Sequence, residues 1–315
     1  MEPLPLRHRL RAWWEGYDLA ELKRILARRQ ADSFDANSNE APAVTSAVPP
    51  QRRATPMPPE AREPAGWTPQ MLAAGQIVWG EHSLSPRRDA QLKTLAANAG
   101  IGSRSRVMHL GAELGGTALL LERGLGCKVL AAETQPALIA QSAGRVVLVS
   151  PQDEPILAAA DFILVDGVAE RGEPLATILR NQSAGLAPGG ALVLRSLVLT
   201  EERAAGSARF RDWAAAEPVR PRLRSTEELS RILQEARLTV TATSSLSDDY
   251  AADVEQCWGD ALDRIRALHR DPTGRALIPT LLTECERWLK RIELIREGIL
   301  GVRQISATRR DRNRR

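Results

Sequence analysis

Residues 106–121 have the sequence Arg-Val-Met-His-Leu-Gly-Ala-Glu-Leu-Gly-Gly-Thr-Ala-Leu-Leu-Leu. A short apolar run, Val107 to Leu110, leads into a turn that contains Gly111, Gly115 and Gly116, and a helical apolar pattern follows. This order predicts a strand, a tight turn and a helix. Such a turn brings backbone N–H groups to the carboxyl edge of a parallel sheet, where ligands with phosphate or carboxylate groups bind. Because any tight strand-to-helix turn can use glycine, a purely structural role stays open.

Short apolar strands and helical segments alternate along the chain on both sides of this stretch. That alternation favours a parallel sheet with helices on both faces, which is an α/β fold. The expected strands cover residues 107–110, 128–133, 145–149, 161–166, 191–199, 238–245 and 302–308.

Composition narrows the class of protein. The chain has 315 residues, 43% of them apolar, which is enough to build a core. No run of about 18 apolar residues occurs, and Met1 to Arg11 lacks the apolar segment of a signal peptide, so we expect neither a transmembrane helix nor a leader. Three widely spaced cysteines suit a reducing compartment, and we expect a cytoplasmic protein.

Histidine content and net charge bear on two kinds of partner, metal ions and nucleic acids. The four histidines form no metal-ligand spacing, so no metal is expected. The net charge of +4 is modest and much of it lies at the chain ends, so nucleic-acid binding is a weak alternative.

The chain divides into four parts. Residues 1–30 form a basic amphipathic pattern with Trp13 and Trp14; it predicts either a helix docked on its own domain or an arm that contacts a membrane surface or a protein. Residues 31–65 are rich in proline, alanine and serine and predict a disordered linker. We expect one domain over residues 66–309, with a helical insertion at 250–300, and a basic tail at 310–315.

From Trp67 to Arg309 the chain resembles the class I S-adenosylmethionine-dependent methyltransferases. It looks closest to the branch with phosphoethanolamine, sarcosine and glycine methyltransferases and cyclopropane-fatty-acid-synthase-like enzymes. The resemblance implies a Rossmann-like, seven-stranded, mostly parallel sheet whose last strand is antiparallel. The matching segments are residues 76–86, 107–116, 129–136, 161–171, the Leu-Ala-Pro-Gly-Gly turn at 186–190, and 286–307.

The resemblance also implies S-adenosylmethionine as cofactor. Glu133 ends the second strand, where the family has an acid that accepts hydrogen bonds from both ribose hydroxyls; a solvated strand-end acid is the alternative. The glycines let backbone N–H groups approach the carboxylate end of the cofactor. The expected cofactor-binding residues are His109, Gly111, Glu113, Gly115, Glu133, Asp153 and Asp166.

Two residues depart from the family's motif. His109 stands where the family has an acid in the first strand, and Glu113 replaces the middle glycine of the turn. Loss of the acid weakens hold on the cofactor's ammonium by about 1.5–3 kcal/mol, or roughly ten- to a hundredfold in affinity. Glu113 could meet that ammonium or repel the cofactor's carboxylate.

Two functions therefore compete. The first is methyl transfer to a small or lipid-like acceptor, with Trp79, Glu81, His82 and Tyr250 on the acceptor side. The second is a catalytically inactive protein that keeps the fold for binding. A nicotinamide-dependent oxidoreductase fits less well, because the turn reads Gly-x-x-x-Gly-Gly and not G-x-G-x-x-G. No catalytic residue is assigned, since methyl transfer needs alignment more than a strong base.

Overall fold

The computed structural model describes residues 66–86, 89–172, 174–201, 205–268 and 270–309. The chain divides into two compact units, Met1–Arg62 and Glu63–Arg315, and the described residues belong to the second. The N-terminal helix expected at 1–30, the linker at 31–65 and the tail at 310–315 lie outside the described residues.

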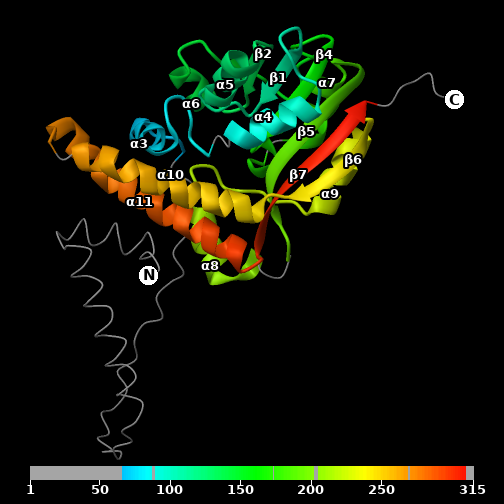
Figure 1. The fold of residues 1–315 in the computed structure, drawn as a ribbon. Coiled ribbons are helices and arrows are strands. Elements are labelled where there is room, and N and C mark those ends of the chain that lie inside the picture. Colours follow the sequence, from blue (N-terminus) through cyan, green and yellow to red (C-terminus); the bar gives the residue numbers. More distant parts are fainter. Residues whose placement is uncertain (1–65, 87–88, 173, 202–204, 269, 310–315) are drawn as a thin grey trace, which may run out of the picture. The chain divides into compact units, whose positions relative to one another are not determined.

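A seven-stranded sheet forms the centre of this unit, in the order β3-β2-β1-β4-β5-β7-β6 (Figure 1). The strands from β3 to β5 pair in parallel, and β7 pairs antiparallel with both β5 and β6. The sheet confirms the fold class that the sequence predicts. The strands are β1 (Arg106–Leu110), β2 (Lys128–Glu133), β3 (Val147–Leu148), β4 (Ala160–Asp166), β5 (Leu186–Leu199), β6 (Leu238–Ser245) and β7 (Leu300–Arg309).

Helices cover both faces of the sheet. Leucines and isoleucines of α7 (Leu175–Ser183) and α9 (Thr226–Glu235) pack on one face, and apolar residues of α4 (Asp89–Asn98) and α5 (Gly116–Leu125) pack on the other. Alternate residues of β1 serve the two cores: Met108 and Leu110 face the first, and Val107 faces the second.

Three further helices form a layer at the end of the sheet. The long helices α10 (Ser247–Leu268) and α11 (Pro272–Arg296) run side by side and pack against α3 (Pro69–Trp79) (Figure 1). No helix in the described ranges is both long and apolar enough to cross a membrane. The remaining elements are α6 (Pro136–Gln141), the 3-10 turn η2 (Val168–Glu170) and α8 (Ala208–Ala216).

Local sequence explains where several helices begin. Thr68 caps α3 by accepting a hydrogen bond from the N–H of Met71, and proline follows at the first helical position. Ser225 and Glu228 form a reciprocal capping box at the start of α9. These side chains satisfy N–H groups that a helix start leaves without a partner.

One expected turn is part of a strand. Residues 186–190 belong to β5, because Leu186 already pairs with Ala160 and Ala191 pairs with Phe162. Four residues thus oppose one, and Gly189, with a φ of 76°, lies in the resulting bulge.

Candidate functional site

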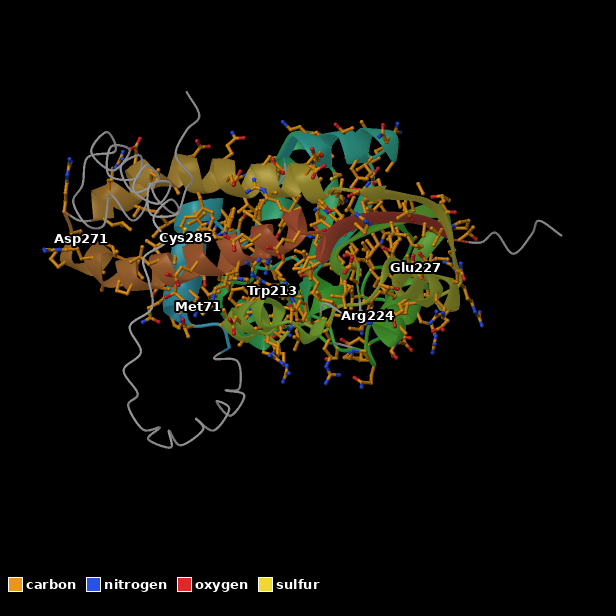
Figure 2. The ribbon with its side chains drawn as sticks, turned by 90° about the horizontal axis from the view of Figure 1, so that it is seen from below. Met71, Trp213, Arg224, Glu227, Asp271 and Cys285 are labelled. Atoms are coloured by element: carbon orange, nitrogen blue, oxygen red, sulfur yellow. The ribbon has the colours of Figure 1, made fainter. Side chains whose placement is uncertain are left out.

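A cavity with a volume of about 160 Å³ opens at the carboxyl ends of β1 and β4. The turn after β1 and the segment after β4 form one half of its wall, which we name the turn half. Side chains from α8, α10 and α11 and the segment after α8 form the other half, which we name the chamber. Trp213 of α8 marks the chamber in Figure 2, where it lies next to α11. A crevice at the carboxyl ends of parallel strands is where ligands bind in open α/β sheets.

The glycines of the turn half allow close packing of the protein on itself. Gly111 has a φ of 81°, and a Cβ there would lie 1.9 Å from the carbonyl oxygen of Asp166. At Gly116 a Cβ would lie 2.2 Å from the Oγ of Ser83. Glu113 adopts the left-handed conformation, with a φ of 52°, although it has a side chain. Contacts within the protein thus already require glycine at 111 and 116.

Backbone donors of the turn are bound within the protein. The N–H groups of Gly111 and Ala112 donate to the carbonyl of Ala132 at 2.9 and 3.0 Å. Gly115 donates to Ala112 at 2.8 Å, and Gly116 donates to His82 at 2.9 Å. These four donors are therefore not free for a ligand.

The Glu113 side chain points back to the loop before α4. Its carboxylate accepts a hydrogen bond from the N–H of Leu84 at 2.8 Å and another from Ser85. Burial raises the pKa of Glu113, and these hydrogen bonds offset only part of that rise. Glu113 thus fixes the cavity wall formed by Leu84 and Ser85.

Glu133 is fully buried, and both of its oxygens have partners. Oε2 accepts from the N–H of Glu113 at 3.0 Å, and Oε1 accepts from the N–H groups of Thr134 and Gln135 at 2.7 and 3.2 Å. Oε1 also forms an ion pair with Arg171, which lines the cavity. Burial is the largest effect and opposes the charge on Arg171, but Glu133, together with Glu113 and Glu170, outweighs it and raises the pKa of Arg171.

A second ion pair joins β1, β4 and β5. Arg195 donates two hydrogen bonds to Asp166, both 2.6 Å long, and the Nε2 of His109 lies 3.0 Å from Asp166. Burial is the largest effect and works against the Asp166 carboxylate, but Arg195 and His109 together outweigh it and lower the pKa of Asp166 well below the ordinary range. Asp166 is therefore ionised and paired with Arg195.

The chamber contains a buried ion-pair network. Glu217 accepts hydrogen bonds from Arg287 at 2.7 Å and from Arg291 at 2.6 Å, and Arg287 also pairs with Glu284. Arg291 donates to the Tyr250 hydroxyl at 2.9 Å. Burial disfavours the Glu217 charge, but the two guanidinium groups lower its pKa.

Aromatic rings surround this network. The Arg291 guanidinium lies 4.3 Å from the centre of the Trp288 ring and 5.8 Å from that of Trp213, so cation–π contacts add to the ion pairs. Both tryptophans are almost fully buried. The chamber therefore offers apolar ring edges beside fixed charges.

Glu170 lies between the two halves. Its Oε1 accepts from the N–H of Leu197 at 2.6 Å and from the Ser196 hydroxyl at 3.4 Å. Burial raises the pKa of Glu170, although Arg291 acts against that rise. Among the described residues, no hydrogen-bond partner meets its Oε2.

Some of the expected site residues meet at this cavity and others do not. His109, Gly111, Glu113, Asp166 and Tyr250 line it. Glu133 lies behind Arg171, and Gly115 belongs to the same turn without lining the cavity. The other four lie elsewhere: Asp153 accepts from the N–H of Ser150 at 2.7 Å, Trp79 packs 4.5 Å from the Trp288 ring, and Glu81 pairs with His82 at 3.1 Å.

Sequence reasoning missed the charged residues of the chamber. Glu284, Arg287, Trp288 and Arg291 recur at helical spacing on α11 and are all buried. The sequence signal for them is the helical spacing that places these charged residues on the same face of α11 as a tryptophan. Arg171, Glu170 and Arg195 carried no such signal.

No protein-family model and no curated protein matches the chain. Among solved structures, phosphoethanolamine N-methyltransferase 2 of Haemonchus contortus, in complex with S-adenosylhomocysteine, has a TM-score of 0.64 at 12% identity, over 76% of this chain and 57% of that one. This chain thus spans just over half the length of that enzyme.

Two further structures have similar folds. A putative sarcosine dimethylglycine methyltransferase from Galdieria sulphuraria has a TM-score of 0.54 at 18% identity, over 71% of this chain and 86% of that one. The cyclase SpnF, which carries out a 4+2 cyclisation, has a TM-score of 0.55 at 16% identity, over 76% of this chain and 93% of that one. The chain therefore has the fold of the class I S-adenosylmethionine-dependent methyltransferases, the group that its motifs resemble.

Proposed function

We propose that this chain is an S-adenosylmethionine-dependent methyltransferase that acts on a small or lipid-like acceptor. One observation carries the proposal: a cavity at the carboxyl ends of β1 and β4 joins a glycine turn to a chamber lined by aromatic rings, and the acid that ends β2 lies directly behind the Arg171 side chain of that cavity. Structurally similar proteins have been solved with S-adenosylmethionine or S-adenosylhomocysteine.

The turn half does not accept the cofactor in the arrangement seen here. Four N–H groups of the turn bind protein carbonyls, and Glu133 is paired with Arg171. A ribose on Glu133 would need the Arg171 side chain to leave. Binding of the cofactor therefore requires a local rearrangement in this half of the cavity.

The chamber supplies what the acceptor side of a methyl transfer needs. When bound, S-adenosylmethionine supplies an electrophilic methyl group. Trp213, Tyr250 and Trp288 exclude water and restrict how an acceptor can lie, which favours in-line attack. Glu170 presents Oε2 without a partner among the described residues, and its raised pKa suits it to take a proton from the acceptor.

A second candidate function is that of a catalytically inactive protein that binds a ligand or partner through the same fold. The Glu133–Arg171 ion pair and the bound turn donors favour it, because both satisfy groups that a cofactor would otherwise use. Similar folds host different functions, so the fold does not choose between the two.

Titration calorimetry of the full chain separates the candidates. If the chain is a methyltransferase, S-adenosylmethionine or S-adenosylhomocysteine binds with a Kd below about 1 mM. Absence of heat at millimolar cofactor would favour the inactive protein. NADH is the control ligand, and heat with NADH alone would instead support the oxidoreductase.

A further inference from the structure

We infer that Arg171 controls access of a nucleoside to this cavity, by occupying the place on Glu133 that a ribose diol would take. The inference rests on the proposed function, because it concerns the ribose of S-adenosylmethionine. Arg171 would thus determine which ligands reach Glu133, although it lies after η2 and outside the glycine turn.

The position of the ion pair supports this role. Glu133 has no exposed surface, whereas 12% of the Arg171 side chain is exposed and lines the cavity. Arg171 therefore separates the Glu133 carboxylate from the cavity. The other acceptor sites on Glu133 are taken by the N–H groups of Glu113, Thr134 and Gln135. The Thr134 hydroxyl also donates to Oε1, at 3.3 Å, from the residue next to Glu133. Among the described residues, Arg171 is the one that forms an ion pair with Glu133, and its long side chain can rotate away.

The backbone under Arg171 is held in place. Its N–H donates to Val168 at 3.2 Å, and the N–H of Arg222 donates to the carbonyl of Glu170 at 2.8 Å. Gly172 has a φ of 76°, and a Cβ there would lie 2.9 Å from the Arg222 side chain. Access to Glu133 thus opens by rotation of the Arg171 side chain and not by movement of the segment.

Two other acidic residues line the same cavity as Arg171. The charges of Glu113 and Glu170 both act on the Arg171 guanidinium, and both residues line the cavity. A rotated Arg171 guanidinium thus stays in a cavity that contains acidic side chains, which lowers the cost of breaking its pair with Glu133. A ligand that brings two hydroxyl groups to Glu133 competes directly with the guanidinium.

The test is calorimetry with S-adenosylhomocysteine on the full chain and its variants. We expect Arg171→Ala to bind at least tenfold more tightly than the unchanged chain. Arg171→Gln removes the charge but keeps a polar side chain, shorter than that of arginine, and it serves where the alanine variant unfolds. Arg145→Ala is the matched control, since Arg145 contacts the turn at the carbonyl of Leu114 and at His82 but has no contact with Glu133; its affinity stays within twofold.

The double variant Arg171→Ala/Glu133→Ala, compared with Glu133→Ala alone, tests whether Arg171 acts through Glu133. If it does, removing the Arg171 side chain gives no gain in affinity for S-adenosylhomocysteine once the Glu133 carboxylate is absent. Equal binding by the unchanged chain and by Arg171→Ala overturns the inference and leaves the methyltransferase proposal standing. If no variant binds, both the inference and the proposed function fall. Circular dichroism melting confirms that each variant is folded.

Discussion

The two halves of the cavity satisfy their buried charges in different ways. In the turn half, Glu113 and Glu133 are held mainly by backbone N–H groups of nearby loops. In the chamber, Glu217 is held by Arg287 and Arg291, which reach it from another helix. Backbone donors persist when a side chain changes, whereas an ion pair is lost with either partner. The chamber should therefore be more sensitive to single substitutions than the turn.

The largest effect is expected at Glu217. Glu217→Ala leaves Arg287 and Arg291 buried beside Trp288 without their shared carboxylate, and should lower the free energy of unfolding by about 3–5 kcal/mol. Urea denaturation measures this change. Glu297→Ala, which breaks an exposed pair with Arg209, is the control and should cost less than about 1 kcal/mol. A similar loss of unfolding free energy in the two variants would contradict the expectation that the buried ion pairs of the chamber matter more than an exposed one.

A smaller loss is expected at Gly111. Gly111→Ala adds the left-handed penalty of about 1–2 kcal/mol to a clash with Asp166, for a total loss of about 3 kcal/mol in unfolding free energy. Gly189→Ala has a similar positive φ with no atom within 4 Å of the added Cβ, so only the conformational penalty applies. Thermal melting of both variants isolates the clash. Equal melting temperatures would show that the β1 turn is not closely packed on β4.

The smallest effect is a pH dependence at Glu113. Because its folded pKa is raised above the ordinary value of 4.5, the carboxyl stabilises the fold below about pH 4.5, and this contribution is lost as the pH rises through the raised pKa. Glu113→Gln cannot titrate but still accepts from Leu84. The Tm of this variant relative to that of the unchanged chain should therefore increase as the pH rises above about 4.5. A constant difference would contradict the raised pKa.

Much of the fold could be predicted because its signals are local. The predicted bounds of β2 and β6 agree with the structure, since each is a short strand pattern set off by turn or cap residues. The glycine turn was found in the same way. The β5 bulge was missed, because proline and two glycines indicate a turn whether or not strand pairing continues around it.

The site was predicted less completely because its contacts join distant residues. Arg171 meets Glu133 across 38 positions, and in the sequence it is an ordinary polar residue after a strand. Charged residues on an amphipathic helix are usually solvated, so the buried Arg287 and Arg291 were not expected. Only the folded arrangement pairs them with Glu217, 70 and 74 positions earlier.

The packing of α3 against α10 and α11 joins segments that emerge at different times during translation. Arg264 donates to the carbonyl of Ile77, 187 positions earlier, and Trp79 packs on Trp258 and Trp288. At a synthesis rate of about 5–20 residues per second, roughly 10–40 s separate the emergence of Ile77 from that of Arg264. During that interval the apolar side of α3 has none of these partners. Until α10 and α11 leave the ribosome, this side of α3 is therefore open to contact with other chains, which is the kind of exposed surface that promotes aggregation.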